Sequence, residues 1–203
     1  MTESLADTLP ALSPKAEEIV RRTTEFLAVG GYNGFSYADI AAAVGISKPS
    51  VHHHFASKAV LVQSVVARYR ADAARGMAAL SANVPDPFAR LEGYARYWAD
   101  CITSGQHPIC ICALMAGELS ALPEEVAQEV RGHFADLSAW LRSVIEDGVA
   151  HGVMAIADPP ESEARTFMAT VHGAMLAARA FGEPTMFPTI AGTALHRLKC
   201  ETI

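Results

Sequence analysis

The chain has 203 residues, of which 51% are hydrophobic and 19% are charged, so it is not intrinsically disordered and is expected to bury a sizeable core. Its longest stretch without a charged residue, 101–117, is interrupted by glutamine, histidine and proline, and its first 15 residues carry two acidic side chains, so we expect neither a membrane span nor a signal peptide. The formal net charge of −6, taken over the whole chain, argues against a nucleic-acid partner, but a net charge averages over all faces of a protein.

The sequence pattern is helical almost throughout. After a tail over 1–12, Ser13 precedes Pro14, which is typical of a helix start, and two glycines at 30–31 end that helix. Further helices are expected, in chain order, at 36–44, from Ser47 onward, from Ser57 to about Leu80 and, after the proline-containing break at 83–87, at 86–104, 111–120, 123–150, 160–181 and 185–199. The predicted fold class is all-α, with a compact N-terminal section of three short helices followed by a larger helical region.

Residues 37–55 have the pattern of a helix-turn-helix. Gly45 permits the positive φ angle of a tight turn between two helices, and Val51 and Phe55 point inward from the second helix and its end. Side chains able to hydrogen-bond phosphates or base edges remain on the outside of that helix: Lys48, Ser50, His52 and His53. A helix presented in this way can enter the major groove of DNA.

The charge distribution favours the same interpretation. The segment 40–71 has no acidic residue, and its cationic side chains are Lys48, Lys58, Arg68 and Arg70, which give it a local charge of +4. The total of −6 therefore leaves −10 for the rest of the chain. Positive charge is concentrated where the motif lies, as binding to a phosphate backbone requires.

At these residues the sequence resembles the TetR family of transcriptional regulators. The resemblance rests on the pattern Tyr37-x-Asp39-Ile40-Ala41-x-x-Val44-Gly45-Ile46-Ser47 through His54-Phe55-x-Ser57-Lys58-x-x-Leu61, and it covers roughly residues 14–62. It implies a DNA-binding domain at 1–58, including the tail, and a helical ligand-sensing and dimerisation domain at 59–203. Pro49 stands where glycine is common in the family and His52 where tyrosine is usual, so an operator preference does not carry over.

The candidates for contact with double-stranded operator DNA are Tyr37, Lys48, Pro49, Ser50, His52, His53 and Lys58. The resemblance implies base-edge or nearby backbone contacts for the side chains at 48, 50 and 53, and phosphate contacts for those at 37, 52 and 58. The two lysines could instead be merely solvated, and His54 is expected to be a packed or capping residue. The three successive histidines are not expected to bind a metal, because adjacent side chains on a helix diverge by about 100°.

The resemblance implies that residues 86–203 form an effector pocket and a dimer interface. Aromatic and methionine side chains with a few polar groups are typical of a pocket for a small apolar ligand. The same residue types at helical spacing are, however, typical of any helical core. The candidate ligand-binding residues are Trp98, Cys101, Cys110, Cys112, Met115, Phe134 and His172. No metal or cofactor is predicted.

Two cysteines lie at the start of the helix predicted over 111–120. A thiol in the first turn of a helix has its pKa lowered by the helix dipole, and this stretch is similar to the corresponding region of TetR-type repressors that sense electrophiles through a cysteine. Three interpretations stay open: buried structural thiols, electrophile sensing with Cys110 more reactive than Cys112, and metal binding with Cys101 or His107. Four unevenly spaced cysteines do not suggest a disulfide framework, so we expect reduced thiols and a cytoplasmic protein.

For a homodimer we expect contact through the helices at 160–181 and 185–199, whose small residues permit close approach. The alternative is that these helices pack only within one subunit. The sequence lacks the common hydrolase, metalloprotease, phosphate-loop and dinucleotide motifs, so we do not expect an enzyme. The resemblance predicts a repressor that a ligand or an electrophile releases from a pseudo-palindromic operator; the alternative is a helical enzyme or interaction module without a DNA-binding role.

Overall fold

The computed structural model describes residues 9–105 and 109–200. Within these stretches the regular structure is helical, with an isolated bridge between Met154 and Lys199, which confirms the predicted all-α class. The chain divides into two compact units, unit 1 with Met1–Arg75 and Ile111–His133, and unit 2 with Gly76–Cys110 and Phe134–Ile203. Residues 111–133, which the sequence assigns to the second domain, therefore lie in unit 1.

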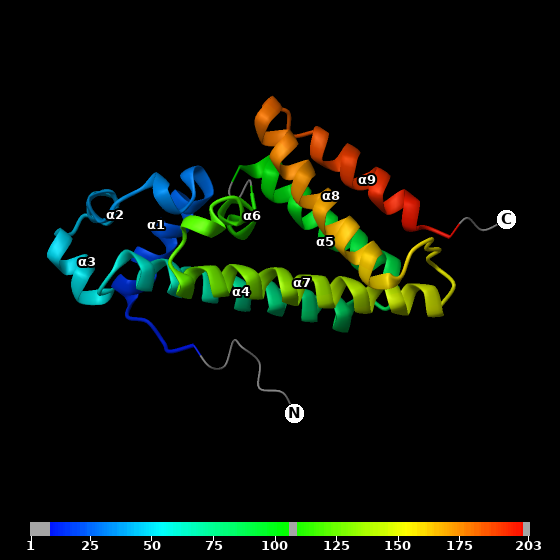
Figure 1. The fold of residues 1–203 in the computed structure, drawn as a ribbon, viewed down its shortest axis with the longest axis horizontal. Coiled ribbons are helices and arrows are strands. Elements are labelled where there is room, and N and C mark those ends of the chain that lie inside the picture. Colours follow the sequence, from blue (N-terminus) through cyan, green and yellow to red (C-terminus); the bar gives the residue numbers. More distant parts are fainter. Residues whose placement is uncertain (1–8, 106–108, 201–203) are drawn as a thin grey trace. The chain divides into compact units, whose positions relative to one another are not determined.

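Unit 1 begins with a group of helices that precede the long α4 (Figure 1). In chain order they are α1 (Pro14–Gly30), the 3-10 turn η2 (Tyr32–Gly34), α2 (Tyr37–Val44) and α3 (Lys48–His54), followed by α4 (Lys58–Asn83), which continues into unit 2. The hydroxyl oxygens of Ser13, Ser36 and Ser47 each accept a hydrogen bond from the backbone N–H three residues later. Each bond satisfies one of the donors that a helix start leaves unpaired.

The turn between α2 and α3 depends on Gly45, whose φ of 69° and ψ of 35° lie in the left-handed region. Glycine adopts this conformation without the steric cost of a Cβ. Around the turn, the helices are joined by fully buried apolar side chains: Ile19, Leu27, Ile40, Val51 and Leu61. Since Val51 belongs to α3, one side of that helix is fixed in the core and the other faces solvent.

The rest of unit 1 comes from later in the chain: α6 (Ile111–Ala116), the 3-10 turn η3 (Leu119–Ala121) and the first part of α7 (Glu124–Ala150). The helix expected over 111–120 ends early, because the backbone N–H groups of residues 117 and 118 bond carbonyls three residues back, which tightens the last turn. An ion pair joins α7 to α4, with 3.3 Å between Arg70 Nη1 and Glu129 Oε2. A Cβ on Gly132 would lie 2.2 Å from that guanidinium, so the glycine makes room for it.

Unit 2 contains the end of α4, the later part of α7, α5 (Pro87–Ser104), α8 (Pro160–Phe181) and α9 (Met186–Leu198). α8 and α9 lie side by side as a helical hairpin, and α9 also packs against α5 (Figure 1). An ion pair between Arg90 Nη1 and Asp147 Oδ2, 3.0 Å apart, links α5 to α7. None of the helices described is long and apolar enough to cross a membrane.

Candidate nucleic-acid interface and effector site

The outer side of α3 presents most of the side chains predicted to contact DNA. This surface, the α3 face, consists of Lys48, Pro49, Ser50, His52 and His53, all exposed except for the half-buried Ser50. The Ser50 hydroxyl lies 2.8 Å from that of Ser47, and His52 Nδ1 lies 3.3 Å from the Ala56 carbonyl oxygen. An ammonium, a hydroxyl and two imidazoles thus share one solvent-facing surface on a helix whose opposite side is anchored in the core.

Tyr37 lies inside unit 1 and joins the start of α2 to the end of α3. Its hydroxyl donates a 2.9 Å hydrogen bond to the carbonyl oxygen of Phe55, and the residue is only 6% exposed. Burial raises the pKa of the Tyr37 phenol to about 12, because the phenolate would lose hydration. Its phosphate contact stays a prediction, and in this structure the side chain holds the two helices of the motif together.

Lys58 also has partners within unit 1. Its ammonium donates a hydrogen bond to the carbonyl oxygen of Phe35 and lies over the rings of Phe35 and Tyr32, 4.1 and 4.7 Å from their centroids. Burial lowers the pKa of Lys58, and the carboxylates of Glu118 and Asp39 oppose that effect. Its phosphate contact likewise stays a prediction, while its structural role is to hold the turn between α1 and α2 against the start of α4.

Glu118 is a site residue that the sequence reasoning missed. Its Oε2 accepts a hydrogen bond from the backbone N–H of Tyr32 at 2.7 Å, and its Oε1 accepts from the backbone N–H and the side-chain amide of Asn33 at 3.4 and 3.2 Å. More than 80 residues of chain separate the partners, so no local pattern could indicate the contact. The one sequence feature that draws attention to Glu118 is that it is the first charged residue after the uncharged stretch 101–117.

The predicted ligand residues are divided between the two units. Trp98, Cys101, Cys110, Phe134 and His172 lie in unit 2, and Cys112 and Met115 lie in unit 1. In unit 2, Trp98 Nε1 and His172 Nε2 are buried without a hydrogen-bond partner, although these residues are only 6% and 7% exposed. The His172 ring meets the Phe134 ring with centroids 5.2 Å apart. A ligand contact for these residues stays a prediction.

The cysteines are mostly withdrawn from solvent. Cys110 and Cys112 have zero exposure, which favours the structural interpretation of their thiols; sensing by Cys110 stays a prediction. Burial raises the pKa of the half-buried Cys101 thiol, which disfavours its reactive thiolate. Within unit 1, a ring nitrogen of His133 lies within 4.8 Å of the Cys112 sulfur, a pairing absent from the predicted metal set; His107 of that set lies outside the described residues.

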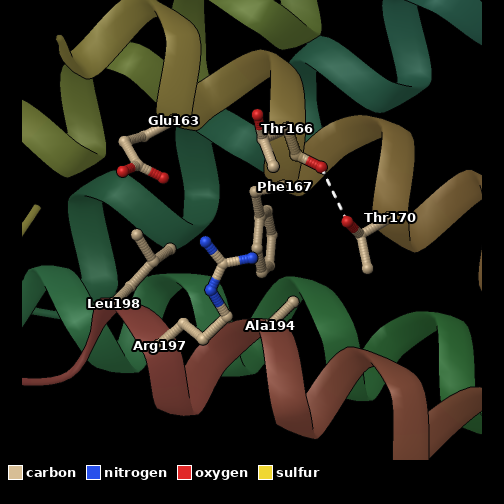
Figure 2. A pocket seen from close by; sticks show the side chains of 7 residues that line it. All are labelled: Glu163, Thr166, Phe167, Thr170, Ala194, Arg197 and Leu198. Atoms are coloured by element: carbon tan, nitrogen blue, oxygen red, sulfur yellow. Dashed lines mark hydrogen bonds between the residues drawn. The ribbon is translucent and has the colours of Figure 1, made fainter. Parts of the chain in front are cut away.

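A small pocket lies between α8 and α9, with Arg197 extending from α9 toward Phe167 on α8 (Figure 2). The Thr170 hydroxyl, at its edge, donates a 2.8 Å hydrogen bond to the carbonyl oxygen of Thr166. Its volume of about 20 Å³ holds about one water molecule. Because effector pockets are at least ten times larger, on the order of 300–1,000 Å³, this pocket is not the predicted effector site.

The comparisons with known proteins match both regions of the chain. The family described as "Bacterial regulatory proteins, tetR family" matches residues 19–65, and "Tetracyclin repressor-like, C-terminal domain" matches residues 87–191. The crystal structure of a TetR-family transcriptional regulator from Agrobacterium tumefaciens is 46% identical, covers 91% of this chain and 97% of its own, and superposes with a TM-score of 0.90.

Two further matches are more distant. The HTH-type transcriptional repressor DhaR of Mycobacterium sp. strain GP1 is 27% identical over 168 residues, which are 82% of this chain and 83% of that protein. The crystal structure of AibR in complex with isovaleryl coenzyme A and operator DNA shares the fold, at 18% identity and a TM-score of 0.71, over 91% of this chain and 98% of its own. The two family matches and the 46% identical structure establish that this chain belongs to the TetR family of bacterial transcriptional regulators.

Proposed function

We propose that this protein is a transcriptional repressor that binds double-stranded operator DNA as a homodimer and is released from it by a small-molecule effector. The observation that carries the proposal is the α3 face, a polar and cationic helix surface within a segment, 40–71, that has no acidic residue. The relatives support it, since DhaR is named a repressor and AibR was solved with isovaleryl coenzyme A and operator DNA. A repressor acts where its operator is, so the proposed location is the cytoplasm, and no catalytic role is assigned.

The proposed dimer interface is the outer face of α8 together with α9. At spacings of three and four residues, α8 exposes mostly small side chains: Thr166, Ala169, Gly173, Leu176 and Ala180. Leu176 is 44% exposed and Phe181, at the helix end, is 74% exposed. A Cβ added at Gly173 or at Gly192 of α9 would meet nothing within 4 Å, so a second pair of helices can approach closely there. Contiguous exposed apolar surface is typical of an interaction site.

The proposed effector is a molecule with an apolar body and at least one oxygen or nitrogen able to form a hydrogen bond. Buried polar atoms in proteins are nearly always hydrogen-bonded, so Trp98 Nε1, a donor only, calls for an acceptor. His172 Nε2 can donate or accept, depending on its tautomer. The neighbouring Phe134 ring supplies apolar and edge-to-face contact.

DNA binding is tested by incubating the full chain with a random pool of duplexes and sequencing the duplexes retained. We expect a pseudo-palindrome whose half-sites are about 34–36 Å apart, with an affinity that falls steeply as salt rises. Lys48→Ala should lower the salt slope by about 1, and Lys199→Ala, a control in unit 2, should leave it unchanged. Failure of the unmodified chain to retain any duplex would contradict the proposal and leave an interaction module without a DNA-binding role.

The interface and the effector site have separate tests. Leu176→Glu should sediment as a monomer at micromolar concentration, whereas Val149→Glu, at a 40% exposed position of α7, should remain a dimer; equal masses would rule out this interface. For the effector, compounds that release the selected duplex are titrated into the protein, and their binding is followed by tryptophan fluorescence. Trp98→Phe should weaken their binding, whereas Trp140→Phe, whose indole already donates to Ser81 at 2.9 Å, should not.

A further inference from the structure

The carboxylate of Glu118 binds the turn that connects α1 to α2. It accepts hydrogen bonds from the backbone N–H groups of Tyr32 and Asn33 and from the Asn33 side-chain amide, at 2.7, 3.4 and 3.2 Å. Hydrogen bonds to an ionised acceptor are roughly twice as strong as neutral ones. The turn is therefore held by a charged group from a segment far away in the sequence.

Gly31 is shaped to admit this carboxylate. Its φ of 66° lies in the left-handed region, and a Cβ built on it would lie 2.4 Å from Glu118 Oε2 and 2.9 Å from Glu118 Cδ. Any other residue at position 31 would have to displace the carboxylate and would also be strained. The carboxylate therefore occupies space that a glycine at position 31 leaves open.

The contact also reaches the beginning of the helix-turn-helix. Phe35, directly after η2, offers its carbonyl oxygen to the ammonium of Lys58, and the charge of Glu118 favours the protonated form of that lysine. Two residues further on, α2 begins at Tyr37. The backbone held by Glu118 at 32–33 therefore leads within a few residues into the helix that positions α3.

Glu118 belongs to the region matched by the C-terminal family description, 87–191, yet it folds within unit 1. We propose that Glu118 is a positioning residue for DNA binding: its carboxylate fixes the turn at 31–33 and thereby the placement of α2 and the α3 face. The proposal rests on the proposed function, since it gives operator affinity a dependence on a side chain that lies just after α6 and outside the α3 face.

The test compares Glu118→Ala, Glu118→Gln and Glu17→Gln, the last an exposed charge-matched control on α1. With the duplex selected by the unmodified chain, Glu118→Ala should bind about tenfold more weakly, which corresponds to about 1.4 kcal/mol. Glu118→Gln keeps one acceptor oxygen and should recover part of the loss. Glu17→Gln should bind no more weakly than the unmodified chain, because it removes a negative charge without touching the turn.

Hydrogen exchange on the same full-length variants separates positioning from general destabilisation. In Glu118→Ala the amides of Tyr32 and Asn33 should exchange at least several times faster, while those of the buried α4 residues Leu61 and Val62 should not change. Unchanged duplex affinity in Glu118→Ala, or weaker binding with unchanged exchange at residues 32 and 33, would overturn the proposal while leaving the repressor function intact. Failure of the unmodified chain to bind any duplex would overturn both.

A double-mutant comparison tests the contact with Gly31 directly. Gly31→Ala in the unmodified chain should weaken duplex binding by about tenfold or more, since the new methyl group displaces the carboxylate. In the Glu118→Ala background the same change should weaken binding several-fold less, because only backbone strain remains. Equal effects in both backgrounds would overturn the assignment of the carboxylate as the group that fixes the turn.

Discussion

Replacing Tyr37 with phenylalanine separates a structural role for this side chain from a phosphate contact. The change keeps the buried ring and removes the hydroxyl, which leaves the Phe55 carbonyl oxygen without its 2.9 Å partner. A neutral hydrogen bond of this kind contributes about 1 kcal/mol. At neutral pH, Tyr37→Phe should therefore lower the free energy of unfolding by about 1 kcal/mol.

At alkaline pH the sign of this difference should reverse. Folding raises the pKa of Tyr37 to about 12, compared with about 10 in an unfolded chain. The stabilisation that depends on the protonated phenol is fully present below pH 10 and is lost as the pH rises from 10 to 12. At pH 11 the loss amounts to about 1.4 kcal/mol for the unmodified chain and is absent from the variant, so Tyr37→Phe becomes the slightly more stable protein.

The assay is urea unfolding of both proteins at pH 7 and pH 11, combined with titration of the selected duplex at several salt concentrations. A structural Tyr37 predicts crossing stabilities and an unchanged affinity for the duplex at each salt concentration. Parallel stability curves would refute the reasoning on burial, and a stability difference near zero at pH 7 would refute the hydrogen bond. Several-fold weaker duplex binding by the variant with an unchanged salt slope would favour the phosphate contact, because an uncharged hydroxyl can bond a phosphate without releasing a counterion.

Three further variants test the Lys58 hydrogen bond, the turn of the helix-turn-helix and the accessibility of the thiols. Lys58→Met should lose about 2 kcal/mol through the charged hydrogen bond to Phe35, which calorimetry should record as a fall in Tm of about 2–4 °C per kcal/mol; an unchanged Tm with a reduced salt slope would instead mark a phosphate ligand. Gly45→Ala should lose about 1–2 kcal/mol to left-handed strain, compared with almost nothing for Gly34→Ala, and equal Tm values would contradict the turn geometry. Cys110→Ser should leave the fastest phase of reaction with a thiol reagent intact, because the Cys110 side chain is fully buried; loss of that phase would favour electrophile sensing.

The local features of the helix-turn-helix region could be predicted because they depend on residues close together in the sequence. Ser13, Ser36 and Ser47 cap the helices that follow them, and Gly45 ends α2 in the left-handed region. Each depends on residues within three or four positions of one another. The exposed α3 face and the buried Val51 follow from helical periodicity in the same way.

The features that could not be predicted depend on contacts between distant segments. The hydroxyl of Tyr37 and the ammonium of Lys58 were predicted to bind phosphates, and only the folded chain brings the carbonyl oxygens of Phe55 and Phe35 to them. Burial of Cys110 depends in the same way on segments that pack around it, which an argument from the dipole of one helix does not include. The shorter α6 is a different case: it ends at Ala116, directly before Gly117, and glycine is a local signal for a helix end.

Residues 111–133 fold within unit 1, and this matters for the construction of hybrid repressors. A hybrid can be made by joining the DNA-binding region of one regulator to the effector region of another between the two family matches, at residues 66–86. Such a hybrid would take residues 111–133 of unit 1 from a different parent than the helix-turn-helix. With a junction after residue 70, Arg70 would face a foreign residue in place of Glu129, and with any junction in this range the turn at 31–33 would face one in place of Glu118. A graft that carries 111–133 with its own DNA-binding region preserves both contacts, so compatibility between parents has to be judged over two separate stretches of sequence.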